Sequence, residues 1–537
     1  MPKFILNDQE VEAKPGQTII QAAEDHGMEI PHYCYHPDLP IDGNCRMCLV
    51  EVEKMPKLTP ACTTVASEGM VVRSANERVK TAVRGVLEFL LINHPVDCPV
   101  CDQAGECRLQ DYYMVYGLHT SEIPQSLKVR KSTAVDLGPV MLDQERCVEC
   151  SRCVRFFEHV THTGELQFFG RGDHVRIGTI NNEKLHNAYS GNVAEICPVG
   201  ALTDHDFRFK ARVWFLHSTD SICGGCSTGC NLRIDHRDGT LFRLQARRNV
   251  DVNKSWLCDE GRYSLHELNN GERVMRPLLK GGDGLQAPAT WDEAAHAIDA
   301  RLKEIVGASG TDTILGFASP SATNEALYLF KQYVGGQIGA SQFDFRTDSE
   351  DQRVSEKEDD ILRYRDKHPN TMGALKLDWM SAELGGIDGA IRAARDGKLK
   401  AGVINYFKPL VPRPTDAEAE AKIAELVKAL EYSVVLAAHK ADWQQQASVV
   451  LPVAAWSEED GTYTNYQGRV QLAAKAIEPG GDILPVWEVF AMLLHVSGAE
   501  SRWMTPDEVL ATMIEKAPAF RGLDLDQRRS PGVLATA

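Results

Sequence analysis

The first residues of the chain alternate between apolar and polar side chains. Residues 3–6 (KFIL) and 10–13 (EVEA) each show the period of two that is typical of a half-buried strand. A helix is predicted next, because Thr18 and Gln21 fit a capping box at its start and Gly27 suits its end. The chain therefore begins with two strands and a helix, the first elements of a small mixed domain.

Residues 77–93 show the period of an amphipathic helix. Ser74 and Glu77 fit a second capping box, and the pattern ends at His94 and Pro95. The helix would deliver His94 to the cysteine-rich stretch that follows it. Residues 119–140 are polar, which predicts a linker.

Strand and helix patterns alternate from about residue 270 onward. A capping box at residues 290–293 starts a predicted helix. Its apolar positions are Trp291, Ala294, Ala295, Ile298, Leu302 and Ile305. Buried-type strands are predicted at residues 313–318, 403–407 and 433–438. The alternation predicts a parallel α/β domain.

Residues 344–370 are rich in charge and poor in apolar side chains, which indicates a surface insertion or a mobile loop.

Length and charge narrow the classes of protein. With 537 residues the chain is too long for one compact core, so several domains are expected. The formal net charge of -17 argues against a nucleic-acid surface and favours docking to basic partner faces. The first residues lack the apolar core of a secretory signal, so we expect a cytosolic protein. No apolar stretch reaches the roughly 20 residues of a membrane-spanning helix, so membrane association is expected only through partners.

The cysteines carry the candidate chemistry. All 15 lie between Cys34 and Cys258. In a reducing compartment such clustering indicates metal or redox chemistry rather than disulfides. An iron-sulfur cluster normally takes four thiolates, from tight local spacings plus one distant residue. The cysteines divide into such sets without remainder if one histidine joins them.

The first set lies in the N-terminal mixed domain. Its members are Cys34, Cys45, Cys48 and Cys62. A wide gap, a CxxC pair and a distant fourth cysteine are a variant of the 2Fe-2S arrangement, and the preceding strands and helix are how a β-grasp ferredoxin domain begins. Structural zinc also suits these cysteines and stays open as the alternative.

The second set is one ligand short. Its members are Cys98, Cys101 and Cys107, and His94 lies four residues before Cys98. A lone histidine at a helix end is often only a capping or surface residue. Beside three cysteines with no spare cysteine elsewhere, its imidazole is predicted to complete the set.

The third and fourth sets predict 4Fe-4S clusters. The third is Cys147, Cys150 and Cys153 with the remote pair Cys197-Pro198. The cysteine that would serve a second cluster in a two-cluster ferredoxin is replaced by Phe157, so one cluster is predicted. The fourth is Cys223, Cys226, Cys230 and Cys258. Its glycine-rich loop can wrap a cubane closely, although zinc again remains an alternative.

The order of these motifs resembles the G-type family of subunits in bacterial NADH:quinone oxidoreductase (respiratory complex I), whose mitochondrial counterpart is the 75 kDa subunit. The resemblance rests on the N-terminal 2Fe-2S domain, the HxxxCxxCxxxxxC segment, the single CxxCxxC with its Cys-Pro, and the CxxCxxxC that opens a molybdopterin-oxidoreductase-like domain. Residues 441–471 are also similar to the pterin-domain signature of molybdenum oxidoreductases. The positions of that signature expected to be structural rather than catalytic are Asp460, Gly461, Thr462, Asn465, Gly468 and Arg469.

The resemblance implies α+β N-terminal iron-sulfur domains followed by a truncated α/β molybdopterin-oxidoreductase-like domain. The expected domains are a 2Fe-2S ferredoxin type at 1–78, a 4Fe-4S domain with one histidine and three cysteine ligands at 79–118, a ferredoxin-like 4Fe-4S domain at 119–215, a 4Fe-4S domain at 216–272 and the pterin-type domain at 273–537. The implied cofactors are one 2Fe-2S and three 4Fe-4S clusters, with His94 as a ligand of the second and the fourth off the main electron path. No molybdenum is expected, because the family's pterin-type domain is regarded as a relic and no cysteine follows Cys258.

The family also implies partners. Electrons would come from a flavin subunit that oxidises NADH, with its small 2Fe-2S subunit, and would continue to a ferredoxin-like subunit with two 4Fe-4S clusters and to the quinone module. The chain would hold no substrate site and would lie in the peripheral arm, on the cytoplasmic side of the bacterial inner membrane. The alternatives are a subunit of an NAD-linked formate dehydrogenase or hydrogenase, and a scaffold stapled by zinc.

Overall fold

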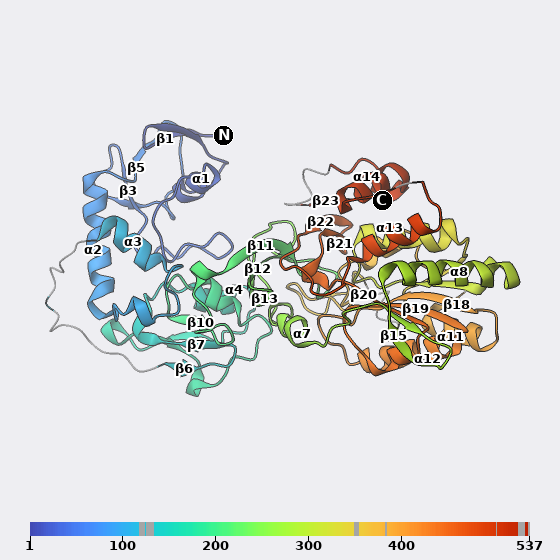
Figure 1. Cartoon of the computed structure of the whole chain (residues 1–537). Helices are drawn as coiled ribbons and strands as arrows, with labels where there is room; N and C mark the ends of the chain where they lie inside the picture. Colours follow the sequence, from blue (N-terminus) through green and yellow to red (C-terminus); the bar gives the residue numbers. More distant parts are fainter. Residues whose placement is uncertain are drawn as a thin grey trace. The chain divides into compact units, whose positions relative to one another are not determined.

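The computed structural model describes residues 1–117, 124, 134–347, 354–381, 384–500, 502–524 and 532–534. The chain forms two compact units, Met1–Leu216 and His217–Ala537. In Figure 1 the first unit runs from blue to green and the second from green to red.

The first unit opens with a five-stranded sheet in the order β2-β1-β5-β3-β4. Its strands are β1 (Lys3–Leu6), β2 (Gln9–Glu12), β3 (Leu49–Val52), β4 (Thr59–Pro60) and β5 (Val71–Arg73). Strand β1 is antiparallel to β2 and parallel to β5. Helix α1 (Ile19–Asp25) buries its apolar face in the core that this sheet forms, and the capping box of Thr18 and Gln21 is present as predicted.

Helix α2 (Glu77–Asn93) follows the sheet and ends at the predicted place, with His94 as its C-cap. The predicted capping box at Ser74 is wrong, because Asn76 is the N-cap and its side chain accepts the Val79 N–H. The hydroxyl of Ser74 instead accepts a hydrogen bond from the side chain of Asn7, in the turn between β1 and β2. The next elements are η1 (Cys98–Val100) and α3 (Arg108–Tyr116).

The rest of the first unit is built from short strands and turns. Most of the predicted linker at 119–140 lies outside the described residues, and its last residues form β6 and begin β7. Strands β10, β7 and β6 form one small sheet, and β8 and β9 form another. The elements are β6 (Val135–Asp136), β7 (Val140–Leu142), η3 (Gln144–Arg146), α4 (Arg152–His159), β8 (Gln167–Phe169), η4 (Gly172–His174), β9 (Arg176–Gly178), η5 (Ile180–Asn182), α5 (Asn192–Ile196), β10 (Leu202–Asp204) and η6 (Val213–Phe215).

The second unit begins with an antiparallel sheet and two short helices. These are β11 (His217–Ile222), β12 (Asn231–Arg237), β13 (Thr240–Ala246), α6 (Asp259–Arg262) and α7 (Leu265–Asn270). The loops between these elements carry the fourth cysteine set, since Cys223 follows β11, Cys230 precedes β12 and Cys258 caps α6.

A seven-stranded sheet in the order β15-β14-β20-β19-β18-β16-β17 forms the centre of the second unit. Within the run β17-β16-β18-β19-β20 every pair of adjacent strands is parallel, as the α/β prediction requires, and β14 is antiparallel to both β20 and β15. The strands are β14 (Leu278–Lys280), β15 (Gln286–Pro288), β16 (Ile314–Phe317), β17 (Gln342–Asp344), β18 (Ala401–Asn405), β19 (Tyr432–Ala437) and β20 (Val449–Pro452).

Helices cover both faces of this sheet. Alternate strand residues point to opposite sides, so Leu315 and Val435 belong to one apolar core and Ile314 and Val434 to the other. The first core contains α11 (Gly386–Arg395) and α12 (Asp416–Ala429). The second contains α8 (Trp291–Ser309), α9 (Asn324–Lys331), η8 (Gln332–Gln337), α10 (Thr371–Lys376), α13 (Val486–Val496), α14 (Pro506–Lys516) and η12 (Pro518–Phe520). Figure 1 shows α8 and α13 on one side of the sheet and α11 and α12 on the other.

The remaining elements complete the second unit. A small sheet is formed by β21 (Gly461–Thr464), β22 (Arg469–Ala473) and β23 (Val533–Leu534), and short turns lie at η7 (Thr311–Thr313), η10 (Asp442–Gln446) and η11 (Trp456–Glu458). No helix among the described residues is long and apolar enough to span a membrane.

The prediction of a surface insertion at 344–370 is wrong for its second half. Residues 348–353 lie outside the described residues, but Asp366, Lys367, His368 and Asn370 are all buried. These polar side chains are enclosed because they pair with one another and with α6 and the elements beside it, and composition does not reveal such partners.

Candidate metal centres

The first three cysteine sets share one apolar core in the first unit. This core joins Tyr33, Val83, Leu109, Val148 and other buried side chains. The cysteines that belong to it or pack against it are Cys34, Cys45, Cys107, Cys147, Cys150 and Cys197. Each of the three sets is represented, so the N-terminal domain, α2–α3 and the CxxCxxC region place their sulfur atoms around the same buried space.

The first set is drawn together by the loop between α1 and β3 and by the residues after β4. Cys34, Cys48 and Cys62 are almost completely buried. Hydrogen bonds from Cys45 and Cys62 lower the pKa of the Cys34 thiol. Hydrogen bonds to Cys34 raise the pKa of both Cys45 and Cys62. A hydrogen bond between Cys62 and Cys48 lowers the pKa of Cys48, so the structure brings all four predicted ligands together.

The second set lies where α2 ends and α3 begins. Cys98 starts η1, Cys101 ends it and Cys107 is the N-cap of α3. Burial, with smaller contributions from the charges of Cys101 and Cys98, raises the pKa of Cys107 to about 11, so the three thiols are neighbours. Gly200 closes the other side of Cys101, because a Cβ atom at Gly200 would stand 2.5 Å from the Cys101 sulfur.

His94, the predicted fourth ligand, lies near this set. It is partly exposed at the C-cap of α2. The pKa of Asp97 is lowered, first by its hydrogen bonds to Arg146 and in smaller part by the charge of His94. His94 is therefore close to the residue that precedes Cys98, and its ligation stays a prediction.

The third set lines a single cavity. Its walls include Cys147, Cys150, Cys153 and Cys197, together with Val148, Ile177 and Val199. Burial raises the pKa of Cys197 to about 12, with a further contribution from the charge of Cys150. Four thiols crowded in this way are stable as thiolates only beside positive charge, which fits a metal cluster.

The backbone of the CxxCxxC run is in an unusual conformation. Glu149 and Ser151 have φ angles of 53° and 63°, in the left-handed region that non-glycine residues rarely adopt. This geometry turns N–H groups inward, and that of Glu149 donates to the sulfur of Cys147 at 3.3 Å. Strain of this kind is typical of a functional loop.

Two buried arginines, Arg152 and Arg155, join the first and third sets. Arg155 donates to the carbonyls of Cys34 and, at 3.4 Å, of Cys150. Arg152 donates to the carbonyl of Tyr35. The spacing of the two arginines on α4 gives no signal for these contacts, because their acceptors lie in a loop more than 100 residues earlier in the chain.

The fourth set is enclosed in the second unit. Burial raises the pKa of Cys223 to about 12, and Cys226 adds to this. Burial followed by the charges of Cys226 and Cys223 raises the pKa of Cys230 and Cys258 well above the usual value. A Cβ atom at Gly261 would lie 2.9 Å from the Cys223 sulfur, so glycine is needed for this approach.

Residues of the pterin-like signature support this loop. Asn465 donates to the carbonyl of Thr228 at 3.1 Å. Both the N–H and the hydroxyl of Thr462 donate to the buried carboxylate of Glu325 at 2.8 Å. These contacts show Thr462 and Asn465 holding neighbouring segments in place, and the structural role of the whole signature stays a prediction. Within the described part of the chain, no three His, Cys, Asp or Glu side chains are already placed to hold a single metal ion.

Five families match successive parts of the chain. They are described as a 2Fe-2S iron-sulfur cluster binding domain (residues 3–77), an NADH-ubiquinone oxidoreductase-G iron-sulfur binding region (84–122), an NADH-quinone oxidoreductase subunit 3 ferredoxin-like domain (138–203), a molybdopterin oxidoreductase Fe4S4 domain (216–270) and a molybdopterin oxidoreductase (273–372 and 389–496). The matches agree with the predicted fold class of iron-sulfur domains followed by a molybdopterin-oxidoreductase-like domain.

Individual proteins match over long stretches. The G-type subunit of the NADH-quinone oxidoreductase of Rickettsia bellii is 39% identical over 354 residues, which cover 65% of this chain and 51% of that protein. The mitochondrial NADH-ubiquinone oxidoreductase 78 kDa subunit of Neurospora crassa is 30% identical over 635 residues, covering 97% of this chain and 84% of that subunit. The chain spans about half the length of the first relatives it matches. Among solved structures, a chain of an NAD+-reducing [NiFe]-hydrogenase is 29% identical over 40% of this chain and 91% of its own, with a TM-score of 0.36.

Proposed function

The chain belongs to the family of G-type subunits of NADH-quinone oxidoreductase and the mitochondrial 75 and 78 kDa subunits, and from this premise we propose that it is an iron-sulfur subunit that relays electrons from NADH oxidation toward quinone. One structural observation supports this proposal independently of the family match. Cysteines of three sets gather around one buried apolar core of the first unit. Redox centres held there would be shielded from water and close enough to exchange electrons.

The residues present fit the proposed clusters. Cys34, Cys45, Cys48 and Cys62 would hold a 2Fe-2S cluster. The 4Fe-4S clusters would be held by His94, Cys98, Cys101 and Cys107, by Cys147, Cys150, Cys153 and Cys197, and by Cys223, Cys226, Cys230 and Cys258. Iron-sulfur clusters, when bound, accept and release single electrons. Soft thiolates in buried sets of four are the donors that such clusters require, and no molybdenum is included in the proposal.

The protein's own part is to set spacing, burial and local charge. Backbone N–H groups donate to sulfur at Glu149 (3.3 Å), Gly225 (3.4 Å) and Gly261 (3.4 Å), which stabilises negative charge on the ligands. The buried cations Arg152 and Arg155 lie beside the third set and act in the same direction. A neutral imidazole at His94 would remove one negative ligand charge from the second centre and raise its potential.

Partners and location follow from the family. We propose that the chain lies in the peripheral arm of complex I, on the cytoplasmic side of the membrane. It would stand between the flavin subunit with its small 2Fe-2S companion and the ferredoxin-like subunit that leads to quinone. The domain boundaries predicted from the sequence are part of the same proposal.

Metal content and electron paramagnetic resonance (EPR) test the function. Anaerobically purified protein should contain about 14 iron atoms per chain with matching acid-labile sulfide, and dithionite should reveal one binuclear and three cubane signals. A colourless protein that holds zinc without iron would overturn the proposal. So would a full complement of clusters that NADH fails to reduce in the assembled complex while dithionite succeeds.

A further inference from the structure

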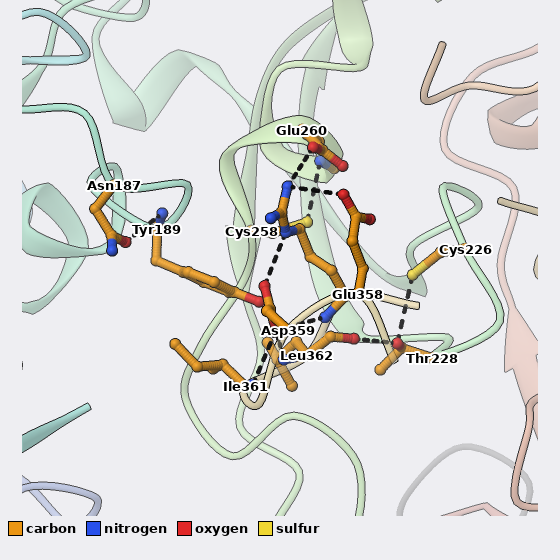
Figure 2. Close-up of polar contacts among 12 residues, drawn as sticks. Asn187, Tyr189, Cys226, Thr228, Cys258, Glu260, Glu358, Asp359, Ile361 and Leu362 are labelled. Atoms are coloured by element: carbon orange, nitrogen blue, oxygen red, sulfur yellow. Dashed lines mark hydrogen bonds and ion pairs between the residues drawn. The ribbon is translucent and has the colours of Figure 1, made fainter. Parts of the chain in front are cut away.

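The charged segment at 354–370 lies against the loop that carries Cys226. The N–H of Ser227 donates to the carbonyl of Asp366 at 3.0 Å, and its hydroxyl donates to the carbonyl of Val354 at 2.9 Å. The hydroxyl of Thr228 donates to the carbonyl of Leu362, and Figure 2 shows this contact beside Cys226. Three hydrogen bonds therefore hold the segment on the fourth cysteine set.

A network of ion pairs joins the segment to α6. Glu260, two residues after Cys258, accepts from Arg363 at 2.5 Å and from Lys367 at 3.2 Å. Lys367 also pairs with Glu358, and Arg363 pairs with Asp359 at 2.8 Å. Figure 2 shows the dashed contacts made by Glu260, Glu358 and Asp359, and of these the charge of Glu260 contributes to the raised pKa of Cys258. The segment thereby brings two cations to the edge of the fourth set.

Lys367 is the more enclosed of the two cations, since its side chain is 9% exposed and that of Arg363 is 20% exposed. Burial opposes its charge, but the hydrogen bond to Glu358 and the charges of Glu260 and Cys226 keep the pKa of Lys367 above its ordinary value. The pKa of Cys223 is raised by burial and by the charge of Cys226, and the charge of Lys367 partly opposes this rise, more strongly than Glu260 adds to it. A largely buried ammonium, hydrogen-bonded to Glu260 and Glu358, therefore lies within electrostatic range of two predicted ligands, Cys223 and Cys226.

We propose that Lys367 is a positioning residue that raises the reduction potential of the centre held by Cys223, Cys226, Cys230 and Cys258, an inference that rests on the proposed function. When that centre gains one electron and no proton, its negative charge increases by one. A fixed cation in a space of low polarity stabilises the reduced form more than the oxidised form. The partly exposed carboxylates of Glu358 and Glu260, which hydrogen-bond to the ammonium, weaken this effect without cancelling it.

An EPR redox titration of the full chain, purified anaerobically and reduced stepwise with dithionite, tests the proposal. The signal of the fourth centre is identified as the one that Cys226→Ala removes. Lys367→Met should lower its equilibrium constant for one-electron reduction roughly tenfold, which is about 59 mV. Lys367→Arg should retain most of the parent potential, and the other three centres should not shift.

Two further variants control the result. Lys422→Met removes another ion-paired lysine, which bonds to Asp388 and Glu418 on the helices of the second unit, and should leave the fourth centre unchanged. Glu358→Gln should raise the potential of the fourth centre, because a negative charge that offsets the Lys367 ammonium is then removed. If Lys367→Met loses the centre altogether, the shift in Glu358→Gln decides the question.

The outcomes separate this inference from the function itself. A parent protein without a fourth iron-sulfur signal refutes the function assigned to those cysteines. A parent signal whose potential stays the same in Lys367→Met, or falls in Glu358→Gln, refutes only the role of Lys367.

Discussion

Gly200 offers a sharp test of the second cysteine set. It follows the Cys197-Pro198 pair and approaches Cys101 so closely that a Cβ atom there would lie 2.5 Å from the sulfur. The same atom would lie 3.2 Å from the Cβ of Gln103. Ordinary contacts between a carbon and a sulfur atom begin at about 3.5 Å, so Gly200→Ala must displace the Cys101 sulfur or the backbone at residue 200 by about 1 Å.

The free-energy cost of Gly200→Ala arises because the new methyl group overpacks the space beside Cys101. Forcing one extra methyl group into a closed space typically costs about 1–3 kcal/mol. If the strain falls on the Cys101 sulfur, retention of iron at this site should weaken roughly 5- to 150-fold. Iron content after dialysis against a chelator and the EPR signal of the second centre measure the loss. The signals of the first and fourth centres should persist.

Gly85→Ala is the matched control. Gly85 lies in α2 with no atom within 4 Å of a Cβ at that position, and alanine is the better helix former by about 1 kcal/mol. This variant should keep every signal and unfold at the same or a slightly higher temperature. If Gly200→Ala behaves like Gly85→Ala, Cys101 is not held in place as argued.

Three other variants test separate features. His94→Cys adds a thiolate and should lower the potential of the second centre without abolishing it; an unchanged EPR titration of every centre would show that His94 is not a ligand. Arg155→Met should lower the thermal unfolding temperature, because the carbonyls of Cys34 and Cys150 lose a donor at a cost of about 1–3 kcal/mol each; equal unfolding temperatures would contradict the bridging role. Burial raises the pKa of Glu459 from 4.5 to about 8, so the folded state keeps a proton that the unfolded state releases, and stability falls as pH rises between these values. Glu459→Gln should remove that fall and gain on the parent between pH 5 and pH 8 by on the order of a few kcal/mol in chemical unfolding, whereas a gain independent of pH would be inconsistent with the titration.

Local patterns predicted the helices and strands, but they predicted the helix caps only in part. The capping boxes at Thr18 and Thr290 are present because a cap depends on residues three positions apart. The box at Ser74 fails because Asn76 is an equally good cap, and the contact between Ser74 and Asn7 decides between them. The parallel strands follow from runs of apolar residues that are long enough to be buried on both faces.

In the candidate site, too, local patterns predict some features and miss others. Cysteine spacing alone predicts which thiols form a set, and the structure brings the cysteines of each set together. The spacing of residues does not predict the contacts of Arg155 and Lys367, because their acceptors lie far away in the chain. Composition predicts that the charge-rich residues 344–370 lie on the surface, because it records polarity but not whether each charge has a partner.

The sequence by itself predicted the grouping of the cysteines and determined most of the local elements, because the core of each motif and each cap depends on side chains separated by a few residues. Only the tertiary structure decided that three sets meet in one apolar core and that a distant segment brings Lys367 to the fourth. The physical reason is that burial and charge at a site depend on which remote segments enclose it. Those contacts form through packing of the whole unit, and no local pattern encodes them.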